Sequence, residues 1–186
     1  MGEHKPYNLN VIDTLVDHEK IIQRGNVCLL NLEDVRHLES NPRSRDFKDT
    51  FAENINSQMT SLVFPVETST QDGERSHINL VHADGDNAKL TFYGSISNEE
   101  SRSELEQHTK NLAEKVFRKN GSLNDFSVEW KSGYVAGEED CAVTMLEGMK
   151  QLSQKKLIEN INLSAHEIKN IRLQHILNME EINKDE

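Results

Sequence analysis

Cys141 is the residue of this sequence best suited to nucleophilic chemistry, because it follows a polar, glycine-containing loop over 131–140 and opens an apolar segment. Apolar residues recur after it at helical spacing: Val143, Leu146, Met149 and Leu152. The N–H groups and the positive dipole end of a helix start stabilise a thiolate, the nucleophilic form of cysteine. The negative charges of Glu138, Glu139 and Asp140, directly before Cys141, act against the thiolate. The alternative interpretation is a buried cysteine that packs as a small apolar residue.

A thiol nucleophile needs a general base, and two histidines lie in one strand-like segment. His77 begins that segment directly after a polar loop, and the first residue of a strand can face a cleft. His82 is the competitor, but it lies deep in the same segment, beside the next turn. Judged by position alone, either histidine can equally be a structural residue or simply an exposed one.

Composition limits the partners of this chain. It has 186 residues, an apolar fraction of 35% and a formal net charge of −11, and it has no cluster of lysine and arginine. This acidic balance argues against a nucleic-acid partner. No apolar run approaches the length of a membrane span, so we expect no membrane partner. Cys28 and Cys141 lie far apart and need no pairing, which predicts a reducing compartment and hence the cytoplasm. Delivery into a host cytosol as an effector is left open.

No motif indicates a cofactor or a metal. The histidines and cysteines do not have the spacing of zinc ligands, and neither a phosphate loop nor a dinucleotide fingerprint is present. The segment Asp84-Gly85-Asp86-Asn87 lacks the glycine and the final glutamate of a calcium loop, and it predicts a hairpin turn. We therefore expect neither kind of site.

The apolar pattern predicts helices at both ends of the chain and strands in its middle. The expected helices cover 11–22, 32–38, the region around 47–55, the segment between Ser97 and Asn120, the segment from Cys141, and 164–177. The expected strands cover 61–66, 77–83, 89–93 and 126–130, with a loop over 67–76. Pro65 marks a strand end or a sheet edge. This order predicts an α+β fold in one domain over 11–180, between flexible tails at 1–10 and 181–186.

Several of these segments together resemble the CE-clan cysteine peptidases, which include the ubiquitin-like-protein (SUMO and NEDD8) proteases, the adenovirus-type proteases and the Yop-type effector acetyltransferases. The 61–66 strand, a loop and the strand that begins at His77 are similar to the opening of that family's domain. Residues 90–95 resemble its next strand, whose end carries the catalytic acid. Asp140-Cys141-Ala142-Val143 resembles its Asp-Cys-Gly-hydrophobic nucleophile signature, and the helix with Arg172 resembles its last helix.

Two positions depart from that family's pattern. Gly94 stands where the resemblance places the catalytic acid, and Val135 stands where it places an oxyanion glutamine. Glycine can neither orient nor charge-stabilise an imidazolium. Three explanations stay open. In the first, a nearby carboxylate takes the place of the acid, and the candidates are Asp84, Asp86 and Glu99. In the second, the enzyme works with a catalytic Cys–His dyad and no third residue. In the third, the chain is a degenerate family member that binds a protein partner without cleaving it.

The resemblance implies a papain-like architecture with a small central mixed sheet of three to five strands flanked by helices. It implies a thiol hydrolase of the deubiquitinase or ubiquitin-like-protein protease type, which acts on a protein substrate such as ubiquitin or a ubiquitin-like modifier. Cys141 is then the nucleophile, His77 the general base and the backbone N–H of Cys141 the oxyanion donor. The alternatives are a protein-binding pseudoenzyme and an acyltransferase on the same scaffold. The sequence does not predict the oligomeric state.

Overall fold

The computed structural model describes residues 7–22, 26–40, 59–69, 76–94, 99–117, 125–131, 140–154, 163–182 and 184. The helices of these residues are α1 (Leu9–Ile22), α2 (Leu32–Ser40), α4 (Glu99–Val116), α5 (Cys141–Ser153) and α6 (Ala165–Ile182). The strands are β1 (Val27–Leu29), β2 (Ser61–Ser69), β3 (Ser76–Asp84), β4 (Lys89–Tyr93) and β5 (Ser127–Lys131).

The strands form one mixed sheet in the order β1-β2-β3-β4-β5. The outer pairs, β1 with β2 and β4 with β5, are parallel, and the two inner pairs are antiparallel. The hairpin between β3 and β4 turns over residues 85–88, as the Asp84-Gly85-Asp86-Asn87 segment predicts. The expected α+β fold with a mixed sheet of three to five strands is confirmed.

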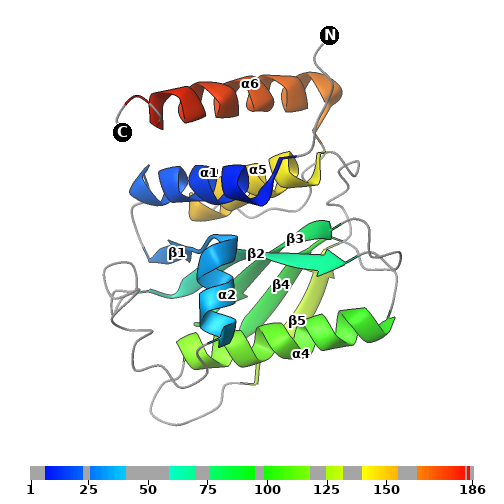
Figure 1. The fold of residues 1–186 in the computed structure, drawn as a ribbon. Helices are drawn as coiled ribbons and strands as arrows, with labels where there is room; N and C mark the ends of the chain where they lie inside the picture. The colour runs from blue at the N-terminus through cyan, green and yellow to red at the C-terminus, as the bar shows by residue number, and fades with distance from the viewer. Residues whose placement is uncertain are drawn as a thin grey trace.

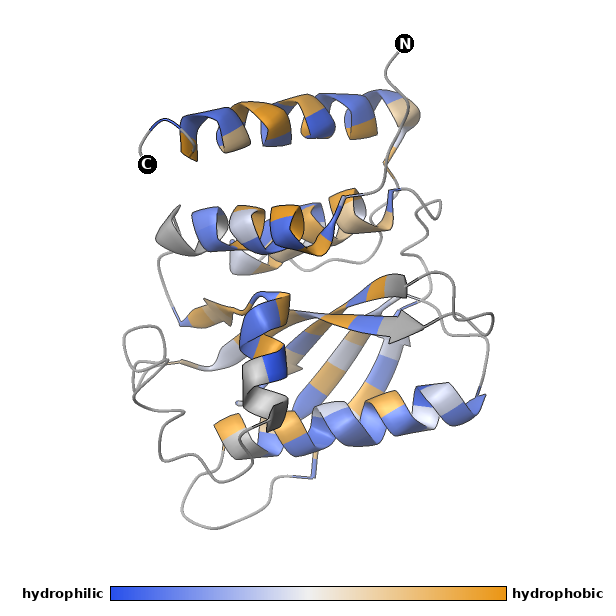
Figure 2. Cartoon of the chain, viewed as in Figure 1, coloured by the Kyte–Doolittle hydropathy of each residue, from blue (hydrophilic) through white to orange (hydrophobic). Residues whose placement is uncertain are grey.

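Helices cover both faces of the sheet (Figure 1). On one face, α1 and α5 pack on a core that contains Leu80 of β3 and Met145 of α5. On the other face, α4 covers a core that contains Val81 and Phe92. The outermost helix, α6, lies against α1 and α5 and has no buried residue. The inner strands carry apolar residues toward both faces, and polar residues stand among them and toward their ends (Figure 2).

The sheet is larger than the sequence predicts. β1 has only three residues and was not expected. β2 and β3 pair as far as Ser69 opposite Ser76, so the hairpin connection is shorter than the expected loop over 67–76. Backbone pairing extends these strands through polar residues, which apolar patterning does not detect. Beyond Val63, β1 no longer pairs with β2, so Pro65 stands on an edge.

The ends of the fold also differ from the expected tails. Leu9 and Asn10 belong to α1, and the Tyr7 hydroxyl lies 3.1 Å from Nδ1 of His175. α6 continues to Ile182. The boundaries at residues 10 and 181 therefore fall inside the fold. The expected helix around 47–55, and Ser97, from which the next helix was expected, lie outside the described residues. None of the described helices combines the length and the apolar character that crossing a membrane requires.

Candidate active site

Cys141 is the first residue of α5, as the sequence predicts, and it is 9% exposed. The residues that follow it in the helix are buried, and the helix packs across β3, the middle strand of the sheet. The thiol is therefore held at the N-terminal end of a rigid, buried helix. At that end the helix presents backbone N–H groups and a positive partial charge.

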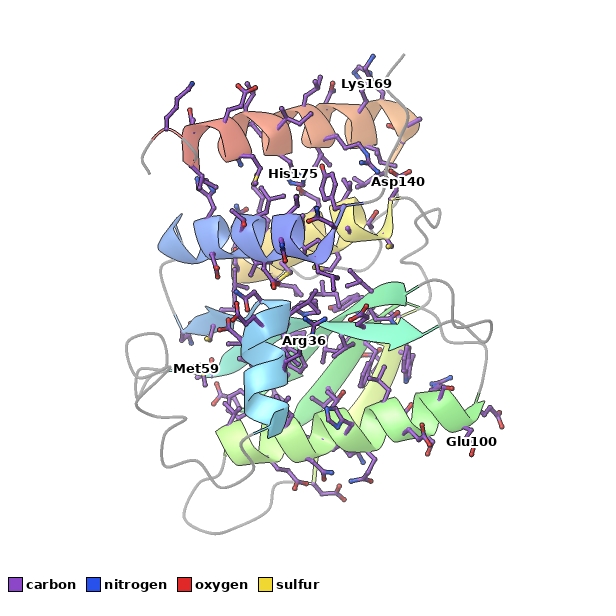
Figure 3. The ribbon with its side chains drawn as sticks, viewed as in Figure 1. Arg36, Met59, Glu100, Asp140, Lys169 and His175 are labelled. Atoms are coloured by element: carbon purple, nitrogen blue, oxygen red, sulfur yellow. The ribbon has the colours of Figure 1, made fainter. Side chains whose placement is uncertain are left out.

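Asp140, directly before Cys141, is held by the last helix of the chain. The guanidinium of Arg172 donates to Asp140 Oδ1 from Nη2 at 2.7 Å and from Nε at 3.3 Å. The same guanidinium lies 5.0 Å from the centre of the Tyr7 ring. The label in Figure 3 places Asp140 at the start of α5, on the side of α6. The Arg172 cation offsets the carboxylate charge that the sequence places beside the thiol.

His77 is the second residue of β3, opposite Thr68 of β2. It lies in the same strand that α5 packs against. The competing histidine, His82, has a structural position: its Nε2 lies 3.2 Å from Ser61 Oγ, and burial lowers its pKa although the charge of Asp84 opposes the change. A neutral imidazole that is bonded within the sheet suits a packing role.

The carboxylates proposed as a replacement acid lie in different places. Asp84 ends β3, seven residues from His77, which is about 23 Å along a strand. Its carboxylate accepts hydrogen bonds from the N–H groups of Asp86 and Asn87 and from the Asn87 side chain. Burial acts to raise the pKa of Asp84, but these hydrogen bonds outweigh it and the pKa is lowered. Asp84 and Asp86 therefore form the hairpin turn at the opposite end of the strand.

Among the three candidate acids, only Glu99 follows the end of β4 in the chain. It is the exposed first residue of α4, shortly after Gly94 in the chain. Val135 and the pair Glu138 and Glu139 lie outside the described residues. Among the residues that are described, no three histidine, cysteine or acidic side chains are grouped so that they could hold a metal ion.

Gly94, where the sequence resemblance places the catalytic acid, has an unusual environment. Its φ of +147° is one that residues with a side chain rarely adopt. A Cβ at this position would collide with Oδ1 of Asn79, whose side chain fills the adjacent space. Asn79 is 0% exposed, two residues after His77 on β3. Sequence reasoning did not single out Asn79. The available signal was a polar residue between Ile78 and Leu80 in an otherwise apolar strand.

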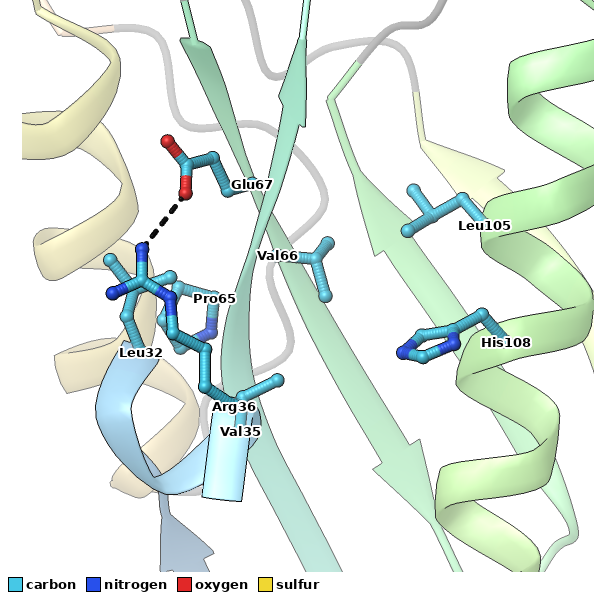
Figure 4. Close-up of a pocket in the computed structure, with 8 residues that line it drawn as sticks. All are labelled: Leu32, Val35, Arg36, Pro65, Val66, Glu67, Leu105 and His108. Atoms are coloured by element: carbon cyan, nitrogen blue, oxygen red, sulfur yellow. Dashed lines mark hydrogen bonds and ion pairs between the residues drawn. The ribbon is translucent and has the colours of Figure 1, made fainter. Parts of the chain in front are cut away.

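A pocket of about 290 Å³ lies on the edge of β2, between α2 and α4 (Figure 4). An ion pair between Arg36 and Glu67, with 3.1 Å between Nη2 and Oε2, stands at one side of it. Its other lining residues are Leu32, Val35, Pro65, Val66, Leu105 and His108. None of the candidate catalytic residues lines it.

Comparison of sequences finds no matching family model and no matching curated protein. Comparison of structures does find matches. The SUMO protease Ulp1, with its catalytic cysteine oxidised to a sulfenic acid, matches with a TM-score of 0.71 and 10% identity, over 97% of this chain and 80% of that chain. The Ulp1 protease domain in complex with Smt3, the yeast ortholog of SUMO, matches with a TM-score of 0.65 and 13% identity, over 92% of this chain and 75% of that chain.

A third solved structure is the Xanthomonas campestris effector XopD bound to ubiquitin. It matches with a TM-score of 0.59 and 12% identity, over 94% of this chain and 93% of that chain. At these identities the comparisons establish the fold. The chain has the fold of the CE-clan cysteine proteases, as the sequence resemblance implied.

Proposed function

We propose, from this CE-clan protease fold, that the protein is a thiol hydrolase that cleaves the C-terminal linkage of ubiquitin or a ubiquitin-like modifier. One observation carries the proposal: Cys141 is the first residue of a buried helix, α5, and that helix packs on the strand that carries His77. The solved neighbours support the choice of substrate class, because two of them are complexes with Smt3 or with ubiquitin.

The proposed reaction is acyl transfer to the thiol, followed by hydrolysis. Cys141 Sγ forms a bond to the carbonyl carbon of the linkage, and His77 takes the thiol proton and delivers it to the leaving amine as the C–N bond breaks. Water then attacks the thioester, and the thiol and a free carboxylate are released. The backbone N–H of Cys141 donates to the oxyanion of each tetrahedral intermediate.

Electrostatics at the start of α5 are consistent with this role. The Arg172 cation compensates the Asp140 carboxylate, so this carboxylate opposes the effect of the α5 dipole on the thiol less strongly. The net charge of −11 suits a partner that presents a basic surface.

The second candidate function is binding of the same kind of partner without turnover. One observation favours it: position 94, where the resemblance places the acid, is a glycine with a positive φ and no room for a side chain. A protein of this kind would hold a modifier on the same surface and leave its linkage intact.

Ubiquitin and SUMO probes that carry a C-terminal electrophile test the proposal. We expect the wild type to be labelled at Cys141, and Cys141→Ala to be unlabelled while the matched variant Cys28→Ala keeps labelling. We expect His77→Ala to lose roughly 100-fold or more in labelling rate. His82→Gln, which retains a hydrogen-bonding group for Ser61, should label at close to the wild-type rate. Absence of labelling with every probe, together with retained modifier binding by Cys141→Ala, would favour the binding function instead.

A further inference from the structure

We infer that the outer face of α6 binds a second copy of this chain, and that the two copies form a symmetric dimer in which their α6 helices pack antiparallel. This goes beyond the proposed function, because α6 carries none of the candidate catalytic residues and the dimer needs no chemistry at Cys141. The exposure of apolar residues on α6, their spacing along the helix and the charges that flank them support it.

The strongly exposed large apolar side chains of this protein are gathered on α6. Among the residues that the structure describes, they are Leu173, Ile176 and Leu177, which are 51%, 53% and 53% exposed. The other side of the same helix already faces the protein, where Met179 packs against the core that α1 and α5 share with the sheet. A surface helix normally turns polar residues to the solvent, so packing within one copy does not account for these three side chains.

The exposed apolar residues follow the outer side of α6. Figure 3 shows Lys169 pointing away from α1 and α5, whereas His175 lies between α6 and those helices. Leu173, Ile176 and Glu180 follow Lys169 at steps of four, three and four residues, so they share its side of the helix. We call Lys169, Leu173, Ile176 and Glu180 the outer seam. Steps of four and three residues are the spacing at which one helix packs along another in a coiled coil.

The charges of the outer seam are complementary to an antiparallel copy of the seam itself. Along the helix the seam has the order Lys, Leu, Ile, Glu. An antiparallel copy therefore places its Ile176 opposite Leu173 and its Glu180 opposite Lys169. A parallel copy would instead place lysine opposite lysine and glutamate opposite glutamate, and these like charges repel. Because each contact occurs twice about a two-fold axis, the antiparallel pairing closes as a dimer.

A second copy accounts for this face better than an unrelated partner does. An exposed apolar patch by itself fits many apolar surfaces. In the outer seam, however, the basic residue stands four positions before Leu173 and the acidic residue four positions after Ile176. This placement about one midpoint is what a two-fold axis requires of a helix that pairs with itself. With only two apolar layers the interface is small, so we expect a weak, reversible dimer.

Sedimentation equilibrium of the full chain tests the inference. Protein concentrations of roughly 10 μM to 1 mM cover weak association. Salt at about 0.15 M limits the repulsion between two copies of net charge −11, because it screens charges beyond about 8 Å. We expect the average mass of the wild type to rise from 21.3 kDa toward twice that value as the concentration increases. The double variant Leu173→Gln/Ile176→Gln should stay monomeric. Gln174→Ala, at an exposed position of α6 outside the seam, is the matched control and should associate like the wild type.

Charge reversal tests the direction of the pairing and leaves the apolar residues of the seam intact. Lys169→Glu and Glu180→Lys each place like charges opposite one another twice in the dimer, so each should weaken association by about fivefold or more. The double variant Lys169→Glu/Glu180→Lys keeps the net charge and exchanges the two ends of the seam. It should therefore associate within about twofold of the wild type. Circular dichroism verifies that every variant keeps its helices.

A wild type that stays at 21.3 kDa over the whole concentration range would overturn the inference. A dimer that Leu173→Gln/Ile176→Gln still forms would overturn it as well, because the interface would then lie elsewhere. Single charge reversals without effect, or a double reversal that does not restore association, would rule out the antiparallel seam. If the wild type is monomeric and added ubiquitin or SUMO binds it but not Leu173→Gln/Ile176→Gln, the face belongs to the modifier instead. Probe labelling of Cys141 is measured separately, so a failed dimer leaves the proposed function standing.

Discussion

The guanidinium of Arg172 donates to Asp140 Oδ1 at 2.7 Å, and thereby ties the last helix to the residue immediately before Cys141. The two side chains are only 12% and 23% exposed, so water screens the pair poorly. The same guanidinium covers the Tyr7 ring. Three segments that are distant in sequence, the one before α1, the start of α5 and the middle of α6, therefore meet at one cation.

We predict that Arg172→Met lowers the free energy of unfolding by about 1–3 kcal/mol, because it leaves a half-buried carboxylate without its partner. The double variant with Asp140→Asn should be less destabilised than the sum of the two single variants. Urea unfolding measures all three. Arg36→Met is the matched control: its ion pair with Glu67 is 54% and 32% exposed, so its loss should cost less than about 1 kcal/mol. Equal losses for the two arginine variants would contradict this prediction.

Replacement of Gly94 by alanine should destabilise the fold. The added Cβ meets the side chain of Asn79, and a φ of +147° is strained for any residue that has a Cβ, so we expect a loss of about 1–3 kcal/mol. Ser103→Ala, on the exposed face of α4, should change stability by less than about 0.5 kcal/mol. Thermal or chemical unfolding distinguishes the two. A neutral Gly94→Ala would mean that β4 and the Asn79 side chain rearrange easily around the added Cβ.

The same geometry predicts that one substitution cannot place a working catalytic acid at position 94. Gly94→Asp introduces the carboxylate but also the clash and the strained φ. We expect lower stability and no gain in probe labelling of Cys141. Combining it with Asn79→Ser removes the clash, and the double variant should recover part of the stability that Gly94→Asp loses.

His175 should make stability sensitive to acid. Burial, followed by the charges of Lys150 and Arg172, lowers its pKa from 6.5 to about 4. Its ring lies between α6 and the core helices (Figure 3) and is bonded to the Tyr7 hydroxyl. Because the unfolded chain binds the proton more tightly, stability falls as the pH decreases from 6.5 toward 4, by up to about 3 kcal/mol.

His175→Gln retains a partner for Tyr7 but does not titrate, so its stability should depend less steeply on pH over that range. Urea unfolding at pH 7, 5.5 and 4.5 measures the difference between the two proteins. Parallel curves for wild type and His175→Gln would show that this histidine is protonated without cost in the folded state.

Glu106 is a structural residue of α4, because its carboxylate joins this helix to Trp130 of β5. Its Oε1 accepts a hydrogen bond from Trp130 Nε1 at 2.6 Å and another from Arg102 at 3.1 Å, and Trp130 stacks on Phe92 with ring centroids 4.6 Å apart. We expect Glu106→Ala to cost about 1–2 kcal/mol, because the indole donor loses its acceptor. Glu104→Ala, exposed on the same helix, should be within about 0.5 kcal/mol of wild type. Tryptophan fluorescence and urea unfolding report both variants.

The local features of this protein follow from the sequence alone. The start of α5 at Cys141, the turn after Asp84 and the start of the last helix at residue 164 were all predicted. At that last start, Ser164 and Glu167 form a capping box in which Ser164 N–H donates to Glu167 at 2.8 Å. Each depends on residues within one helical turn or one hairpin. Their hydrogen bonds and dihedral preferences are therefore decided by near neighbours in the chain.

Contacts between distant segments were decided by the tertiary structure. β1 exists because three buried residues pair with β2, and the ion pair of Arg172 joins residues that are 32 positions apart. The amide of Asn79 lies beside Gly94 only because β3 and β4 pair in one register, and a shift of one residue would turn it to the other face. The sequence by itself specifies which residues are capable of chemistry. Which of them meet depends on packing and strand register, because these set the distances between groups that no local rule relates.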